Sequence, residues 1–197
     1  MKKLLVELKT SIVATLVIAV IVCGAYPVAV LAVAQGVFPE KANGSLIVAN
    51  GTTVGASLLG QSFTQASYFH PRPSAAGTGY DATASGGSHL GPTSRKLVET
   101  VRDRVAQYRA ENGLAPDALV PADAVTASAS GLDPDISVKN ALFQAARVAK
   151  ARGWEKASVE ELLRKHTQGR TFGLLGEPRV NVLQLNLALD ALGRNGK

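Results

Sequence analysis

The sequence has a single cysteine, Cys23, and only 5% aromatic residues among its 197 positions. One cysteine cannot form a disulfide within the chain, so a folded domain must be held by its apolar core or by partner proteins. Long apolar runs are also scarce, because only the N-terminal region contains one of membrane-spanning length. A transporter with several membrane spans is therefore excluded.

Positive charge is not concentrated in any part of the chain. The net charge is +6, but the basic residues after position 90 alternate with acidic ones, as in Arg102, Asp103 and Arg104. Nucleic-acid binding requires clustered cations, usually with aromatic side chains that stack on bases. The sequence has neither feature, so we do not expect a nucleic-acid partner.

The motifs of nucleotide and nucleophile sites are incomplete. The glycine-rich segment of residues 85–91 lacks the lysine of a phosphate-binding loop and runs into a proline instead of a helix. The pattern G-x-S-x-G around Ser88 ends in Leu90, so a nucleophile elbow is not predicted.

The candidates for a metal site are His70, Asp81 and His89. A hydrolase triad could be assembled from one of the histidines His70, His89 and His166 with a serine and Asp81, or a dyad could use His70 or His89. Nothing in their spacing selects one arrangement, and loop histidines are more commonly solvated or hydrogen-bonded. We therefore predict no catalytic residue and no metal ligand.

An uncharged segment, residues 10–39, dominates the N-terminal region. Within residues 12–37 about 21 of 26 side chains are apolar, which explains the slightly positive mean hydropathy of +0.12. This length and purity predict a transmembrane helix over residues 10–37. Because Lys2, Lys3 and Lys9 precede it, the positive-inside rule places residues 1–9 in the cytoplasm and residues 38–197 outside.

Two processing signals compete with a retained anchor. Ala32-Val33-Ala34 resembles a cleavage site, but the apolar segment far exceeds the roughly 7 to 15 residues of a signal peptide. Cys23 suggests lipoprotein processing, but Val22 is too bulky for the position before such a cysteine, so we interpret Cys23 as membrane-buried. Pro27 predicts a local kink or a covering helix, and a contact with another subunit is predicted by small residues: Ala14, Ala25 and Ala29.

After the anchor, periodicity and capping signals predict a mixed domain. In chain order we expect a hairpin over residues 45–54 with its turn at Asn50-Gly51, a loop over 61–92, a helix from Thr93 or Ser94 to Gly113, a strand over 125–130, a helix from the Ser137 cap to Gly153, a helix from a Ser158/Glu161 capping box to about 169, and a helix over 182–192 with Leu185, Leu189 and Leu192 aligned. The predicted fold is α+β: a single N-terminal transmembrane helix followed by one extracytoplasmic domain of short strands and about four helices.

Rigid, mostly uncharged loop segments are the best candidates for a binding surface. Proline and glycine restrict the backbone, while tyrosine, phenylalanine and arginine supply contact area. The predicted partner-binding residues are Tyr68, Phe69, His70, Arg72, Pro73, Tyr80 and Arg179.

The chain resembles the KdpC family, the small C subunit of the bacterial Kdp potassium-transporting ATPase. The blocks that carry the likeness, in order, are Ala42-Asn43-Gly44-Ser45-Leu46-Ile47, Gly60-Gln61-Ser62-Phe63, Tyr68-Phe69-His70, Arg72-Pro73-Ser74-Ala75, Ala84-Ser85-Gly86-Gly87-Ser88, Val125-Thr126-Ala127-Ser128-Ala129-Ser130-Gly131-Leu132-Asp133, Arg147-Val148-Ala149-Lys150-Ala151-Arg152, Val180-Asn181-Val182 and Leu185-Asn186-Leu187-Ala188-Leu189. Two positions depart from the family pattern: His89 stands where Asn is usual, and Asp135-Ile136-Ser137-Val138 replaces a stretch that usually ends in Pro.

The resemblance implies a single-pass protein of the bacterial inner membrane in a complex with a potassium-translocating subunit, a P-type ATPase subunit and a very small membrane peptide. The family is also described as a catalytic chaperone that raises the ATP affinity of the pump, with a glutamine contacting ATP transiently. The residues of this chain that could serve are Gln61, Ser85, Gly86, Gly87, Ser88 and Gln144. ATP is cytoplasmic whereas the predicted domain is outside, so we favour a non-catalytic subunit that stabilises assembly and covers the outer ion entrance.

Overall fold

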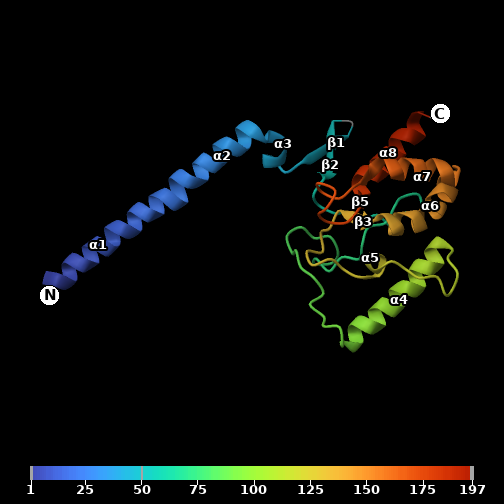
Figure 1. The fold of residues 1–197 in the computed structure, drawn as a ribbon, viewed down its shortest axis with the longest axis horizontal. Helices are drawn as coiled ribbons and strands as arrows, with labels where there is room; N and C mark the ends of the chain where they lie inside the picture. Colours follow the sequence, from blue (N-terminus) through green and yellow to red (C-terminus); the bar gives the residue numbers. More distant parts are fainter. Residues whose placement is uncertain (1, 50, 196–197) are drawn as a thin grey trace. The chain divides into compact units, whose positions relative to one another are not determined.

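The computed structural model describes residues 2–49 and 51–195. The chain divides into two compact units at Leu46. Figure 1 shows the elements of both units, a long helix in the first and a mixed domain in the second. The predicted α+β class with one long apolar N-terminal helix is confirmed.

The first unit is dominated by a helix of 36 residues, Lys2–Val37. It consists of α1 (Lys2–Ala19), the π-helical η1 (Val20–Ala25) and α2 (Tyr26–Val37), and the short α3 (Pro39–Ala42) follows. At 1.5 Å per residue the long helix measures about 54 Å, well beyond the roughly 30 Å of a bilayer's hydrocarbon core. None of its residues is buried, and it is the one helix among the described residues long and apolar enough to cross a membrane.

The π-helical turn accommodates Pro27 inside this helix. Proline has no N–H to donate, so it leaves a carbonyl of the preceding turn without its usual partner. The turn just before it widens, and the Tyr26 N–H bonds to the Ile21 carbonyl five residues back. The predicted interruption at Pro27 therefore takes the form of a local π adjustment within one continuous helix.

The predicted hairpin is present as β1 (Leu46–Ala49) paired with β2 (Thr52–Ala56). Gly51 has a positive φ of 76°, as a tight turn requires, while Asn50 lies outside the described residues. From the end of β2 to Ser94 the chain has no helix or strand among its described residues, which confirms the long predicted loop.

All four predicted helices of the second unit are confirmed. They are α4 (Arg95–Asn112), α6 (Val138–Arg152), α7 (Lys156–His166) and α8 (Val182–Asn195). Ser94 and Ser137 cap α4 and α6 through their side chains, and Gly113 and Gly153 end these helices with φ of 62° and 67°. These local signals worked because each satisfies backbone groups that the helix itself leaves open.

One helix start signal, one core position and one strand were predicted incorrectly. The predicted Ser158/Glu161 capping box is wrong, because the N-cap of α7 is Glu155, three residues earlier, and it makes no side-chain cap bond. Leu185 and Leu189 are fully buried as predicted, but Leu192 in the last turns of α8 is 43% exposed.

The predicted strand over residues 125–130 is also wrong. Val125 ends the short helix α5 (Ala122–Val125), and the serines that follow bond to nearby backbone instead of pairing in a sheet. The Ser128 hydroxyl accepts from the Gly131 N–H at 2.9 Å and the Ser130 hydroxyl from the Leu132 N–H at 3.1 Å. Serine side chains of this kind favour turns over strands.

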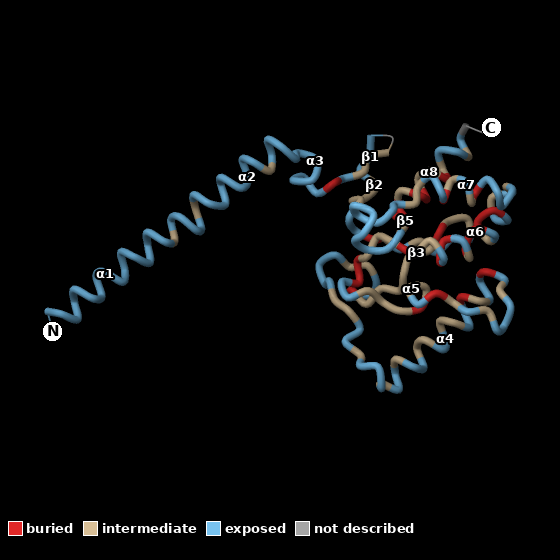
Figure 2. The backbone as a smooth tube through the Cα atoms, in the orientation of Figure 1, coloured by how far each residue is buried: buried red, intermediate tan, exposed pale blue. Residues whose placement is uncertain are grey.

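The main sheet consists of three very short antiparallel strands in the order β3-β5-β4. Their bounds are β3 (Asp135–Ser137), β4 (Thr167–Gln168) and β5 (Arg179–Asn181), and Ile136 lies opposite Val180 in the register. Helices α6, α7 and α8 pack against this sheet, and Figure 2 shows the buried segments on these elements. The core contains Ile136, Ala141, Ala145, Val148, Val159, Leu163, Val180, Leu185, Leu189 and, from the long loop, Phe69.

Candidate functional site

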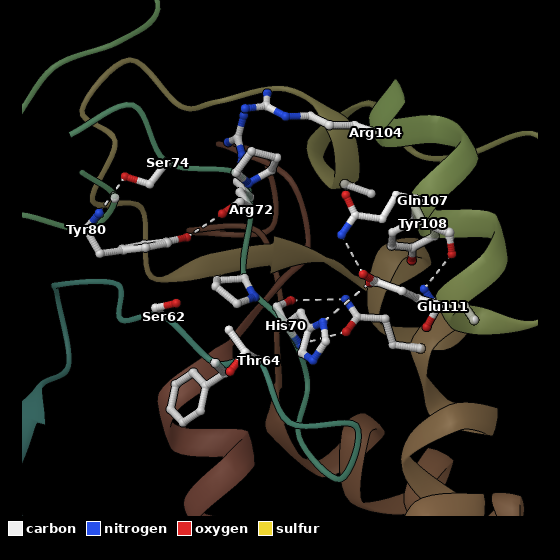
Figure 3. Close-up of a pocket in the computed structure, with 17 residues that line it drawn as sticks. Ser62, Thr64, His70, Arg72, Ser74, Tyr80, Arg104, Gln107, Tyr108 and Glu111 are labelled. Atoms are coloured by element: carbon white, nitrogen blue, oxygen red, sulfur yellow. Dashed lines mark hydrogen bonds and ion pairs between the residues drawn. The ribbon is translucent and has the colours of Figure 1, made fainter. Parts of the chain in front are cut away.

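A polar cleft of about 460 Å³ lies between α4 and the loop segment of residues 62–80. Four predicted partner-binding residues line it: His70, Arg72, Pro73 and Tyr80. Figure 3 labels three of these loop residues, His70, Arg72 and Tyr80, together with four residues of α4: Arg104, Gln107, Tyr108 and Glu111. The cleft is the best candidate site because it brings these two sets of polar side chains together.

Gln144 forms the floor of the cleft and is completely engaged with its own chain. Its Oε1 accepts from the His70 N–H at 2.7 Å and from Arg147 at 2.8 Å. Its Nε2 donates to the His70 carbonyl at 3.0 Å and to Asn140 Oδ1 at 2.9 Å. With 1% of its surface exposed, Gln144 has no donor or acceptor left for a nucleotide.

A hydrogen-bonded chain continues from Gln144 through buried polar side chains. The Tyr108 hydroxyl donates to Asn140 Oδ1 at 2.8 Å, and Asn140 Nδ2 donates to Asp123 at 3.0 Å. Asp123 also accepts from the N–H and hydroxyl of Ser137 at 2.8 and 2.9 Å. This network fastens α4, α5 and α6 to each other, and its members satisfy each other's polar groups.

Asn186 on α8 bonds to both backbone groups of Phe69, as Gln144 bonds to both backbone groups of His70. It accepts from the Phe69 N–H at 2.8 Å and donates to the Phe69 carbonyl at 3.0 Å. The Phe69 ring is fully buried in the core, so it does not offer the contact surface that the sequence suggested. Its aromatic ring is instead the apolar anchor of the loop, because an irregular segment needs burial to stay fixed.

Tyr68 faces away from the cleft, toward α6 and α8. Its hydroxyl donates to Asp190 at 2.9 Å, and the Arg152 guanidinium lies 4.9 Å from its ring centroid. Arg152 also bonds to Asp190 at 2.8 Å. Burial raises the pKa of Tyr68 above its ordinary value, and the hydrogen bond to Asp190 adds to the rise.

The other end of the cleft is built around Arg72. Its Nη1 is 2.7 Å from Asp133 Oδ2, and its backbone carbonyl accepts from the Tyr80 hydroxyl, as Figure 3 shows. Burial raises the pKa of Tyr80, and the neighbouring Asp133 raises it further.

Arg179 lies outside this cleft. It pairs with Asp135 of the neighbouring strand at 3.0 Å, and burial raises the pKa of the Asp135 carboxyl.

His70 is held as a neutral side chain. Burial lowers its pKa, and the Arg147 guanidinium lowers it further. Glu111 acts in the opposite direction but its carboxylate is 3.8 Å away, too far for a hydrogen bond. The His70 Nε2 lies 3.1 Å from the Gln65 carbonyl, so the ring is tied to its own loop.

The glycine-rich segment is a close-packed turn and not an open phosphate cradle. The Gly86 N–H and the Ser85 hydroxyl both donate to the Ser130 carbonyl, each at 2.9 Å. A Cβ on Gly87 would lie 3.1 Å from the Ala129 carbonyl oxygen. Of the other two nucleotide candidates, Gln61 donates to the Val54 carbonyl in β2 at 2.9 Å, and Gln144 lies in the cleft. Ser85 borders a different hollow from Gln144, so no single cleft gathers these residues.

Within the described part of the chain, no three His, Cys, Asp or Glu side chains form a metal-binding group. Asp81 is occupied by Thr83, whose hydroxyl donates to it at 2.6 Å. His89 has a left-handed backbone with φ of 51°. Asn and His are both enriched in that conformation, which gives a backbone reason for His89 at a position where the family usually has Asn.

The second family departure also has a backbone explanation. Val138 is the first residue of α6, directly after the Ser137 cap. This is the helix position where proline is most favoured, because its N–H would be unpaired in any case. Val138 begins the helix as a proline would, but no ring fixes its φ.

Sequence reasoning missed the buried polar residues that fix the loop: Asn140, Arg147, Tyr108 and Asn186. Arg147 donates to the carbonyls of Ala66 and Tyr68 at 2.7 and 3.0 Å, and burial lowers its pKa. One signal was available. Asn140 and Gln144 stand four residues apart on the same helix as the inward-facing Ala141, Ala145 and Val148, where surface residues are not expected.

Comparisons with known proteins agree with the resemblance. A family described as KdpC, the K+-transporting ATPase c chain, matches residues 8–191. A potassium-transporting ATPase KdpC subunit from Nitratidesulfovibrio vulgaris is 56% identical over 192 residues, covering 96% of each chain. The protein of the same name from Mycobacterium bovis is 54% identical over 186 residues, covering 94% of this chain and 98% of the relative. That from Koribacter versatilis is 50% identical over 190 residues, covering 96% and 95%.

Proposed function

This chain belongs to the KdpC family, and from that premise we propose that it is a non-catalytic subunit of an ATP-driven potassium uptake complex. Its proposed role is to stabilise the assembled complex and to cover the outer ion entrance. The proposed partners are the potassium-translocating subunit, the P-type ATPase subunit and a small membrane peptide. In this proposal ATP is hydrolysed by the pump subunit.

The observation that carries this proposal is the closed hydrogen-bond network behind the cleft. Gln144 and Asn186 use their side-chain amides to hold the backbone of His70 and Phe69. Groups engaged in this way give a loop a fixed shape, which suits recognition of another protein. They are poorly suited to contact a nucleotide, because every new bond would first require breaking an existing one.

The position of the charges supports an outer location for the second unit. Three lysines precede the uncharged segment of residues 10–39, and only Glu40 and Lys41 follow within the next thirty positions. The positive-inside rule then favours a cytoplasmic N-terminus. A domain on that side of the membrane can reach the outer ion entrance but not cytoplasmic ATP.

Exchange of the anchor separates contributions of the two units. Residues 1–37 are replaced by an unrelated single span with the same charge bias, and the tagged full-length chain is purified with the other subunits of its complex. We expect the same subunits to co-purify, in reduced amount if the native helix adds a contact. Complete loss of all partners on anchor exchange, with the second unit folded, would contradict an assembly role of the outer unit.

A further inference from the structure

Exposed apolar side chains of the second unit gather on a few elements. Among the described residues after position 46, ten large hydrophobic side chains are exposed, and six of them belong to the β1–β2 hairpin, the segment just after it or the loop between β4 and β5. These six, called the apolar patch, are Val48, Leu58, Leu59, Phe172, Leu174 and Leu175. The other four lie separately on α4, α6, α8 and the segment after α4.

The elements that carry the apolar patch are neighbours. Asn181 at the end of β5 donates to the carbonyl of Ser57, the residue after β2, at 2.8 Å. Gly55 in β2 lies so close to α8 that a Cβ there would be 2.9 Å from Leu183 Cδ2. The two parts of the patch are therefore attached to neighbouring elements, because β2 leads into Leu58 and Leu59 and the loop that carries Phe172 leads into β5.

The loop between β4 and β5 is braced, although all its residues from 168 to 178 are exposed. Thr171 and Leu175 exchange two backbone hydrogen bonds of 2.8 and 2.9 Å. At the base of the loop Arg170 contacts both carboxylate oxygens of Glu177, at 2.9 and 2.8 Å. This bracing holds the apolar side chains in place instead of letting them collapse onto the domain.

Phe172 at the tip has two unusual properties. Its backbone is left-handed with φ of 54°, a conformation that costs a bulky residue about 1–3 kcal/mol. Its side chain is 90% exposed, so no packing within the described chain offsets this cost. Strain and exposure together are typical of a residue placed for binding and not for folding.

The charge pattern identifies the kind of partner. Residues 42–71 contain no Asp, Glu, Lys or Arg, and Arg170 and Glu177 neutralise each other at the base of the loop. An anionic lipid surface would be matched by clustered basic residues. A neutral apolar patch is matched by a neutral apolar protein surface.

The length of the tether identifies where that protein surface lies. Strand β1 begins nine residues after the end of α2 at Val37, and nine residues span at most about 30 Å even when extended. In the proposed topology, the hairpin that carries part of the apolar patch can therefore lie at most about 30 Å beyond the end of the anchoring helix, which keeps it within reach of the outer surface of a membrane-embedded partner.

We propose that the apolar patch docks on the uncharged outer surface of a membrane-embedded subunit of the same complex, with Phe172 and Leu174 as its main anchors. This inference rests on the proposed function, because it assigns the contact surface through which assembly is stabilised.

Matched substitutions test the assignment in the full-length chain expressed with its complex. Leu174→Asp is compared with Leu119→Asp, because both leucines are 79% exposed and only Leu174 is in the patch. We expect Leu174→Asp to reduce the recovery of the other subunits at least about tenfold, as loss of an interface anchor does, and Leu119→Asp to leave it unchanged. Equal recovery with both variants, or equal loss, overturns the proposal.

A second variant removes the ring without risking the fold. Phe172→Asn places a residue that tolerates the left-handed backbone, so we expect the thermal midpoint of the chain to stay the same or rise while co-purification falls. Retained co-purification overturns Phe172 as an anchor. If the unsubstituted chain itself recovers no subunit, the proposed function fails instead.

A photo-crosslinking residue at position 174 identifies the contact directly. We expect a covalent adduct to another subunit of the complex. An adduct only to lipid, only to a second copy of this chain, or to nothing in the assembled complex overturns the proposal.

Discussion

Two buried side-chain amides fix the irregular segment at the centre of the domain. The loop around Phe69 and His70 has no regular partner for its backbone, and unpaired buried N–H and C=O groups are strongly destabilising. Gln144 and Asn186 each supply one donor and one acceptor to this backbone, as a neighbouring β-strand would. The shape of the candidate site therefore depends on buried polar residues whose side-chain amides are already bonded to the loop backbone.

Replacing Gln144 by alanine should destabilise the fold strongly. The substitution leaves the N–H and carbonyl of His70 without partners and also removes bonds to Arg147 and Asn140. We expect a loss of about 2 to 4 kcal/mol in the free energy of unfolding, measured on the full chain by denaturant titration of Trp154 fluorescence.

Gln107 provides the matched control, because it lines the same cleft but is exposed and bonds only to Glu111. Gln107→Ala should change stability by less than about 0.5 kcal/mol. Unchanged stability in Gln144→Ala together with weaker ATP binding by the complex would contradict the structural role and favour the nucleotide role.

His70 should make stability depend on pH. Its pKa in the folded chain is lowered below its ordinary value of 6.5, chiefly by burial. The unfolded chain therefore takes up a proton first as the pH falls below about 6.5, and stability decreases with it. His70→Gln should remove this part of the decrease between pH 7 and 5, measured as the difference between the two unfolding curves. Parallel pH profiles of the two proteins would refute the assignment.

At the scale of elements, the turn of residues 128–131 locks the glycine-rich segment in place. Gly131 has φ of 66°, and a Cβ there would lie 2.6 Å from the Ala76 nitrogen and 2.7 Å from the Gly86 carbonyl oxygen. Gly113 has nearly the same φ, 62°, but has nothing within 4 Å. Substituting the two glycines therefore distinguishes the cost of backbone strain, which both share, from the cost of steric clash, which only Gly131 has.

We expect Gly113→Ala to cost about 1 kcal/mol, the strain of a left-handed alanine alone. Gly131→Ala should cost at least about 3 kcal/mol, because the backbone atoms around it cannot move aside independently. Thermal or denaturant unfolding of both variants measures the difference. Similar values for the two would show that the segment of residues 85–88 is not packed against this turn as described.

The elements also show what the sequence could predict. Helices α4 and α6 were predicted within a residue because Ser caps and C-terminal glycines are local signals. Strands β3 and β5 were missed because three residues are too short for visible alternation, and their pairing joins positions such as Ile136 and Val180 that are far apart in sequence. For the site, the loop of His70 and Arg72 was predicted from its rigid composition, whereas Phe69 was misplaced because aromaticity alone does not distinguish a core anchor from a contact residue.

At the scale of the whole molecule, the proposed function requires the two ends of the long helix to lie on opposite sides of the membrane. The single cysteine makes this testable, because Cys23→Ala leaves a chain without cysteine. One new cysteine is then introduced at Ser88 or at Leu4, both exposed, and intact cells or spheroplasts are treated with a maleimide that does not cross membranes. We expect labelling of Ser88→Cys before lysis and of Leu4→Cys only after lysis. The reverse pattern would contradict the outer location of the second unit and would make ATP binding by this unit in the cytoplasm possible.

In the proposed function, the second unit stabilises the assembled complex from the outer side and does not change the ATP affinity of the pump subunit. The most direct measurement is the ATP dependence of potassium-stimulated hydrolysis, normalised to the amount of assembled complex, with and without residues 38–197. We expect much less assembled complex without these residues but an unchanged KM for ATP in the complex that remains. Normal assembly with a clearly raised KM for ATP would contradict it.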